Sequence, residues 1–288
     1  MYNENEMQQL LEKVLKRLSI QEAQGAGGAA ACSGGDIVTP DITQIDLREE
    51  ILVPKPHDLD LLKIMKKSTP ARIGVFRAGP RPKTRTLLRF RSDHAAAMDA
   101  VFSSVSEEFL NKMGLPTVQT KCRNKDEYLT RPDLGRQFDD EALAEVKKIV
   151  GPNPQVVLYV SDGLSSTAIE SNVADTLPVI VNGLKNSGIT VKPFFVKFGR
   201  VPAMDPISEA TQAEVCCALI GERPGLVTAE SMSAYMAYKA TINMPEARRN
   251  VLSNIHSQGT PAVEAGAHIV DLIKSILKNK ASGLDLKQ

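Results

Sequence analysis

Four apolar runs in the second half of this 288-residue chain constrain its fold more than any other feature. The runs cover residues 156–160, 191–198, 215–220 and 251–255. Stretches with helical character separate or follow them, at about 165–186, 205–213, 229–239 and 262–279. Because strands that alternate with helices form parallel sheets, the pattern predicts an α/β fold with an open parallel sheet in the C-terminal half.

The preceding part of the chain is expected to be mixed and mainly helical. Its predicted elements are helices over 58–67, 92–113 and 139–150 and a short strand over 73–76. The longest helix starts at Ser92 or Asp93, because both residue types cap helices, and Gly114 lies beyond its end. Its apolar face comprises Met98, Val101, Phe102, Val105, Phe109 and Met113. The last helix starts at Asp139 or Asp140.

An amphipathic helix is predicted near the N-terminus. Its apolar stripe comprises Met7, Leu10, Leu11, Val14, Leu15 and Leu18. The segment 24-QGAGGAAACSGG-35 follows and has the composition of a flexible linker. The helix either packs on its own protein or docks on another surface. The predicted divisions are therefore residues 1–20, 21–36, 37–154 and 155–288.

Each apolar run leads into a loop rich in turn residues. These loops are 161-SDGLSS-166, 199-GRVPAMDP-206, 221-GERPGL-226 and 256-HSQGTP-261. In a parallel sheet all four emerge at the carboxyl edge, where open α/β folds bind ligands. Four such loops on one edge indicate a large ligand, although tight turns alone would explain one or two of them.

The loop sequences discriminate between ligand classes. The first loop lacks the G-x-G-x-x-G pattern, which disfavours an NAD enzyme. The segment 254-NIHSQG-259 has the histidine and glycine spacing of the cobalamin motif D-x-H-x-x-G, but Asn254 replaces the aspartate. A histidine ligand relies on a carboxylate partner for its orientation. His256 is therefore expected to be an ordinary loop histidine, and no metal-ligating residue is predicted.

The chain is short of catalytic groups for an enzyme that acts alone. No Ser/His/Asp set, paired acids or metal-ligand cluster stands out in the sequence, so no catalytic residue is assigned. No aromatic stacking platform accompanies the basic segment, residues 77–91, and the net charge is only +1. We expect no nucleic acid partner. No apolar stretch is long enough for a membrane span. The four cysteines have no C-x-x-C spacing, which excludes a zinc ribbon or a thioredoxin-type motif. Cys216 and Cys217 are expected to be buried, reduced thiols on opposite faces of a strand, which fits a cytoplasmic interior.

Several long segments together resemble one enzyme family, the small subunit (light chain) of ethanolamine ammonia-lyase. The segments are 77-RAGPRPKTRTLLRFRSDH-94, 128-YLTRPDLGR-136, 161-SDGLSS-166, 194-FFVKFGRV-201, 219-LIGERPGL-226 and 253-SNIHSQGTPAVEAGAHIVDLI-273. The resemblance runs from about Ile51 to the C-terminus. It implies a carbon–nitrogen lyase that converts ethanolamine to acetaldehyde and ammonia by radical rearrangement, active only with its large TIM-barrel subunit.

The resemblance also implies the cofactor and its contacts. Adenosylcobalamin would bind base-on to a Rossmann-like domain over residues 155–288, while residues 37–154 contact the large subunit. The family's cobalamin contacts match Val201, Glu222 and Val251. From its position alone, Glu222 could equally be a surface residue paired with Arg223.

The resemblance further implies a bacterial cytoplasmic protein housed in a microcompartment, with the N-terminal helix binding shell or cargo. Two other classes remain open: a stand-alone nucleotide-binding Rossmann enzyme, and an interaction module whose basic segment binds nucleic acid.

Overall fold

The structure, a computed structural model, describes residues 49–286. The chain divides into two compact units, residues 1–50 and 51–288, and almost all described residues belong to the second. The expected N-terminal helix, its linker and Cys32 lie outside the described residues. Within residues 49–286 no helix has both the length and the apolar character needed to cross a membrane.

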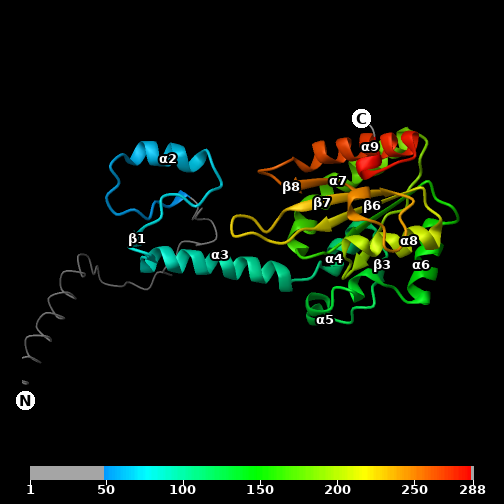
Figure 1. Cartoon of the computed structure of the whole chain (residues 1–288), viewed down its shortest axis with the longest axis horizontal. Helices are drawn as coiled ribbons and strands as arrows, with labels where there is room; N and C mark the ends of the chain where they lie inside the picture. Colours follow the sequence, from blue (N-terminus) through cyan, green and yellow to red (C-terminus); the bar gives the residue numbers. More distant parts are fainter. Residues whose placement is uncertain (1–48, 287–288) are drawn as a thin grey trace, which may run out of the picture. The chain divides into compact units, whose positions relative to one another are not determined.

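A six-stranded mixed sheet forms the centre of the fold (Figure 1). Its strands are β3 (Thr117–Gln119), β4 (Val156–Ser161), β5 (Phe194–Lys197), β6 (Val215–Gly221), β7 (Met232–Tyr238) and β8 (Asn250–Ile255). Their order is β3-β5-β4-β6-β7-β8. The first four are parallel, and β7 is antiparallel to both β6 and β8. Strand β8 therefore runs in the same direction as β6.

The sheet differs from the predicted one in two respects. Residues 229–239 were expected to be helical, but they contain strand β7, and the sheet is consequently mixed rather than all parallel. Methionine, alanine and tyrosine in this segment fit a helix as well as a strand, and hydrogen bonding to β6 and β8 on both sides decides between them. Strand β3 also extends the sheet beyond the C-terminal half.

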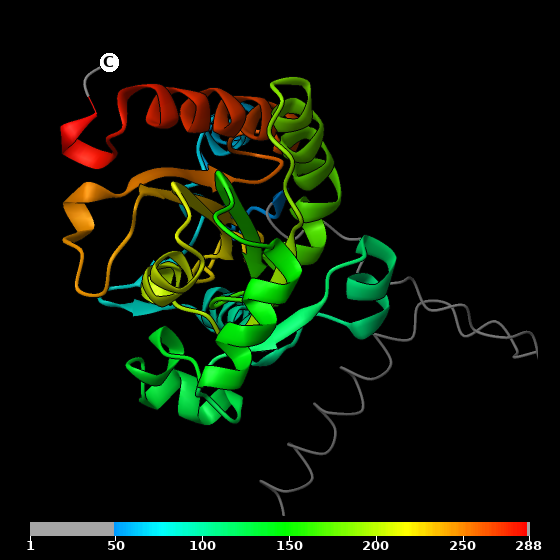
Figure 2. The same cartoon turned by 90° about the vertical axis from the view of Figure 1, so that its right-hand side faces the viewer.

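Helices cover both faces of the sheet (Figure 2). Helices α7 (Ser166–Asn186) and α9 (Ala262–Asn279) lie on one face, and α6 (Asp140–Val150) and α8 (Met204–Thr211) lie on the other. The central strand β4 is buried along its whole length. Because side chains alternate along a strand, Leu158 enters the α7/α9 core and Tyr159 the α6/α8 core. The boundaries of α6, α7 and α9 agree with the prediction.

The part before β3 departs from the predicted boundaries. It contains α2 (Leu59–Lys67), β1 (Arg77–Ala78), β2 (Arg81–Pro82), α3 (Thr84–Phe102) and α4 (Glu107–Met113). The expected strand over 73–76 is irregular, and the expected helix 92–113 is two helices, the first beginning at Thr84. Ser106 caps the second helix, and Gly114 ends it at φ 64° as predicted. Asp93 lies inside α3, where its carboxylate binds Arg72 and Arg89 instead of capping.

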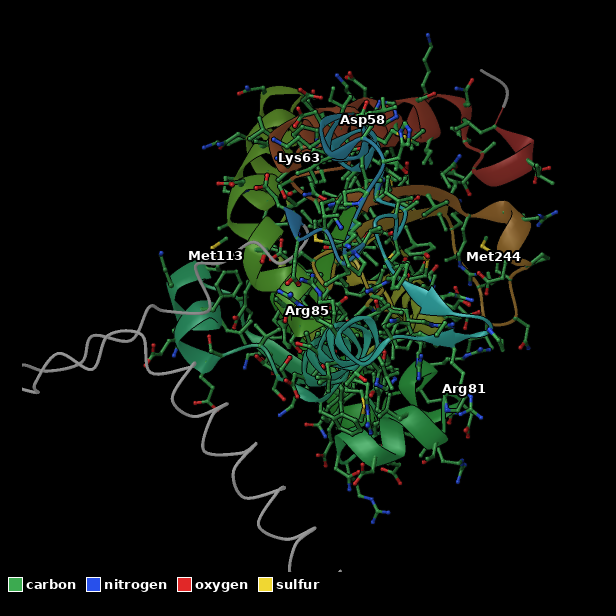
Figure 3. All side chains as sticks on the ribbon, turned by 90° about the vertical axis from the view of Figure 1, so that its left-hand side faces the viewer. Asp58, Lys63, Arg81, Arg85, Met113 and Met244 are labelled. Carbon is green, nitrogen blue, oxygen red and sulfur yellow. The ribbon has the colours of Figure 1, made fainter. Side chains whose placement is uncertain are left out.

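The remaining short elements are α5 (Lys125–Thr130) and the 3₁₀ turns Leu134–Arg136, Val201–Ala203, Glu246–Arg248 and Gly283–Asp285. The basic segment spans the β1–β2 hairpin, which carries Arg81, and the first turns of α3, which carry Arg85 (Figure 3).

Candidate functional site

The four turn-rich loops lie at one edge of the sheet, as the sequence predicts. They follow β4, β5, β6 and β8, and these four strands run in the same direction. Strand β7 begins at this edge, where Met232 pairs with Gly221 of β6 and with Ile255 of β8. The edge therefore carries the β6–β7 connection as well as the loop after β8.

The loops after β4 and β5 are held together by Asp162 and Ser161. The Asp162 carboxylate accepts a hydrogen bond of 2.8 Å from the Phe198 backbone N–H, and the Gly199 N–H donates to Ser161 Oγ at 3.1 Å. Phe198 has a φ of 61°, a left-handed conformation that such a fixed contact stabilises. Burial raises the pKa of Asp162 to about 6, and the nearby Lys125 ammonium opposes that shift.

Two cations flank the ring of Tyr128 beside this loop pair. The Arg200 guanidinium lies 4.1 Å from the ring centroid and donates to the Tyr128 carbonyl at 2.8 Å. Lys125 Nζ lies 5.2 Å from the same centroid and has no hydrogen-bond partner within the described part of the chain. Burial lowers the pKa of Lys125, while Asp162 favours its charged form. These contacts hold Arg200 and thereby place Val201, the next residue.

Two glycines bring the β4 loop against the end of β6. A Cβ on Gly163 would lie 2.2 Å from the Gly221 carbonyl oxygen, and a Cβ on Gly221 would lie 2.1 Å from the Ser165 carbonyl oxygen. The Leu164 N–H donates to the Gly221 carbonyl at 2.9 Å. The β4 loop is therefore packed closely against the end of β6 and lacks the glycine-rich pattern of a phosphate-binding turn, which disfavours the stand-alone nucleotide enzyme.

Glu222 follows Gly221 and bonds a tyrosine on the neighbouring strand. The Tyr235 hydroxyl donates to Glu222 Oε1 at 2.7 Å, and the Glu222 N–H donates to the Ser231 carbonyl at 3.0 Å. Glu222 is half-buried. The side-chain partner in the structure is thus Tyr235, and the alternative pairing with Arg223 is wrong. Burial and the hydrogen bond to Glu222 both raise the pKa of the Tyr235 hydroxyl, which keeps it protonated.

Val251 and Val201 lie on the same side of the sheet as Tyr235. Val251 pairs with Tyr235 across strands β8 and β7, so the two side chains share one face, and Val251 is 51% exposed. Val201 packs against the α6/α8 core, which Tyr235 also contacts. We call Val201, Glu222, Tyr235 and Val251 the open patch. Helix α9 packs against β7 and β8 on the opposite face, and on the α6/α8 side of the edge strand β8 the Val251 side chain is left exposed.

A buried ion pair anchors the strand that carries Val251. Arg249 Nη2 lies 2.7 Å from both carboxylate oxygens of Asp205, and the two side chains are 2% and 5% exposed. Arg249 Nη1 also contacts Glu246 at 2.7 Å. The pair connects the start of α8 to the start of β8. It therefore fixes one end of the open patch relative to the sheet.

The histidine of the 254–259 segment is engaged within its own loop. His256 is buried, its Nε2 lies 2.8 Å from Asn254 Oδ1, and its Nδ1 accepts from the Gln258 N–H at 3.2 Å. Asn254 has a φ of 63°. With both ring nitrogens occupied, His256 has the arrangement of an ordinary loop histidine. Among residues 49–286, no group of three or more acidic, histidine or cysteine side chains is arranged to hold a metal ion.

Sequence reasoning did not find the supporting residues of this site. Tyr235 was assigned to a helix, and nothing in the sequence connects Lys125 with Asp162 or Asp205 with Arg249. The available signal for the last pair is an arginine directly before an apolar run that becomes a strand. The buried thiols were anticipated: Cys216 and Cys217 are free, buried and on opposite faces of β6.

The fold defines a class, an α/β protein with a mixed six-stranded sheet, helices on both faces and turn-rich loops at one edge. Comparison with known proteins then identifies the family. Residues 59–287 match the model of the ethanolamine ammonia-lyase light chain (EutC). The chain belongs to this family.

Three relatives are each named ethanolamine ammonia-lyase small subunit. The one from Clostridium tetani is 54% identical over 294 residues, covering 100% of both chains. The one from Listeria innocua is 53% identical over 99% of this chain and 100% of its own. The one from Clostridioides difficile is 57% identical over 86% of this chain and 85% of its own. Membership therefore rests on full-length similarity.

Proposed function

We propose that the chain is the small subunit of an adenosylcobalamin-dependent ethanolamine ammonia-lyase, which converts ethanolamine to acetaldehyde and ammonia. The observation that carries the proposal is the open patch in a member of this family. Its half-buried carboxylate follows β6 at the edge that carries the turn-rich loops, half-buried Val201 follows β5 at the same edge, and Val251 is exposed on the edge strand β8. Val201, Glu222 and Val251, the three contacts that the family resemblance implies, all belong to it.

The chemistry of the patch fits a corrin. A corrin is a broad, largely apolar ring with primary amides around its rim. Val201 and Val251 would contact the apolar ring, and Glu222 would accept a hydrogen bond from a rim amide. Both ring nitrogens of His256 are occupied within its own loop, so this histidine is not free to ligate cobalt, which supports the base-on form.

The proposed mechanism assigns binding and shielding to this chain. When bound, the cofactor would supply the radical chemistry. The open patch would position the cofactor and exclude water on one side of it. Asp162, the buried acid at this edge, hydrogen-bonds backbone and Ser161 and so orients loops rather than moving protons. Substrate binding and the remaining polar groups would come from the large subunit.

Exposed apolar side chains on the N-terminal helices support a large partner subunit. They are Leu59, Leu61, Ile64 and Met65 on α2, and Leu87, Leu88, Phe90, Met98 and Phe102 on α3. Large apolar side chains exposed in such numbers on two helices are typical of protein interfaces. We assign residues 37–154 to contact with the large subunit and residues 155–288 to a Rossmann-like cobalamin-binding domain.

Residues 1–20 are assigned to docking on shell or cargo of a microcompartment in the bacterial cytoplasm. Their deletion is expected to leave lyase activity intact and to abolish localisation. A truncated chain that still reaches the compartment, or that stays folded and loses activity, contradicts this assignment.

The absorbance spectrum of the co-purified two-subunit complex tests the function. We expect bound cobalamin and ethanolamine turnover by the complex, and no turnover by either subunit alone with added adenosylcobalamin. Activity of this chain alone would refute the subunit assignment. In the complex, Glu222→Ala is expected to weaken cofactor binding about tenfold to a hundredfold, because a charged hydrogen bond is lost. Arg223→Ala, which alters the exposed neighbouring residue, serves as the control.

A further inference from the structure

The most specific polar contact in the open patch involves a residue to which no role is assigned. The Tyr235 hydroxyl and Glu222 Oε1 are 2.7 Å apart and join two strands of the sheet. Hydrogen bonds to a carboxylate are stronger than neutral ones, and this one is half-buried. The contact therefore restrains a glutamate side chain that would otherwise rotate freely at a loop entrance.

The contact also determines what Glu222 offers to a ligand. An ionised carboxylate only accepts hydrogen bonds, and Oε1 already accepts from Tyr235. Oε2 is left to accept from an N–H or O–H donor of a bound molecule. The Tyr235 ring is itself placed by its packing against the α6/α8 core and by its pairing with Ala218 and Val251. The direction of the carboxylate is thus set by the sheet rather than by the loop.

We propose that Tyr235 is a positioning residue for cofactor binding: its hydroxyl orients Glu222 so that the second carboxylate oxygen accepts from an amide N–H at the cofactor rim. The inference rests on the proposed function and deepens it. It names the group that Glu222 recognises, an N–H donor, and the residue through which the fold fixes that recognition. Tyr235 touches Glu222 and acts on the cofactor through it.

Tyr235→Phe tests the proposal, because it removes the hydroxyl and keeps the ring. Tyr238→Phe is the matched control: Tyr238 lies on the same strand but packs on the α7/α9 core. Full-length variants are co-purified with the large subunit, and adenosylcobalamin is titrated by absorbance. We expect Tyr235→Phe to weaken cofactor affinity about tenfold, with kcat at saturating cofactor and KM for ethanolamine unchanged. Tyr238→Phe should bind as the wild type does.

Two further variants separate the inference from the proposed function. Tyr235→Phe in a Glu222→Ala background should weaken affinity no further, because the residue it positions is gone. Glu222→Gln should weaken affinity although it preserves shape, since the amide nitrogen left facing the ligand is a donor.

Each alternative outcome has a distinct meaning. If Glu222→Ala weakens binding while Tyr235→Phe does not, the positioning role is refuted and the proposed function stands. If Tyr235→Phe weakens binding equally in both backgrounds, Tyr235 acts independently of Glu222 and the inference is wrong. Wild-type affinity in Glu222→Gln refutes the N–H donor assignment. A complex that binds no cobalamin at all refutes the proposed function itself.

Discussion

Replacing Arg249 with methionine is expected to destabilise the fold more than any substitution at a surface charge. Arg249 is 2% exposed and contacts both oxygens of the Asp205 carboxylate, which is 5% exposed. Methionine fills most of the arginine volume, so the main effect is a buried carboxylate without its partner. Breaking a buried ion pair in this way costs about 3–5 kcal/mol. For a chain of this size, that corresponds to a melting temperature lower by roughly 6–20 °C.

The pH dependence of the lost stability identifies the unpaired Asp205 carboxylate as its cause. Burial already raises the pKa of Asp205, and Arg249 opposes that shift. Without Arg249, the pKa of Asp205 in the folded state rises further above the pKa of the same carboxyl in the unfolded chain. The folded variant then binds more protons than the unfolded chain, so its stability falls as pH rises through this window. The defect of Arg249→Met should therefore be smaller near pH 4.5 than near pH 7.5.

Urea unfolding of the purified chain, followed by circular dichroism, measures both effects. Arg248→Met is the matched control, because Arg248 pairs with Asp285 on the surface, where such pairs contribute about 0–1 kcal/mol. The double variant Asp205→Leu/Arg249→Met should recover most of the loss, since neither charge remains buried. A defect of equal size at both pH values, or no recovery in the double variant, would refute the reasoning.

Three further predictions concern the loops. Burial raises the pKa of Asp162 to about 6, so the folded state binds this proton more tightly than the unfolded state. Relative to Asp162→Asn, the free energy of unfolding of the wild type should therefore fall by up to about 3 kcal/mol between pH 4 and 7. The same pH dependence of the free energy of urea unfolding in both proteins would refute this. Gly221→Ala should lower the melting temperature far more than Gly225→Ala, since only the former places a Cβ within 2.1 Å of backbone. His256→Ala should leave bound cobalamin in the base-on form, read from the absorbance of adenosylcobalamin and the electron paramagnetic resonance spectrum of bound cob(II)alamin. A changed axial nitrogen signal would show that His256 ligates cobalt.

The elements that the sequence predicts well are long and have one dominant period. Strands β4 and β6 are continuous apolar runs, and α7 and α9 carry apolar residues at helical spacing over many turns. Strand β7 lacks such a pattern, because both of its faces are largely buried and polar residues do not alternate with apolar ones along it. Strand β3 has only three residues and exists through its pairing with β5. Such elements depend on tertiary contacts that a local pattern does not contain.

The residues of the site also fall into those whose position the sequence predicts and those whose position depends on tertiary contacts. The direction of a strand alone determines the edge of the sheet at which its following loop emerges. The sequence therefore predicts that the glycine-rich loops and Glu222 lie at one edge. The partner of Glu222 could not be predicted, since it requires that residues 232–238 form a strand next to β6. Arg223, the adjacent residue in sequence, was the natural candidate, but the sheet brings Tyr235 closer. Pairing across strands thus decides which groups meet at the site.

The turn-rich loops that indicate a ligand are largely occupied with one another. Asp162 and Ser161 bond the β5 loop, Gly163 packs on Gly221, and His256 bonds its own loop. Under the proposed function, ligand contact would therefore fall to the open patch, where Val251 is 51% exposed. An exposed surface of this kind excludes water from a bound molecule only when a second surface closes over it, whereas enclosed pockets bury most of their ligand alone. The proposed radical chemistry would require that exclusion. The exposure of the patch would thus itself be a reason for the two-subunit organisation that the family name implies.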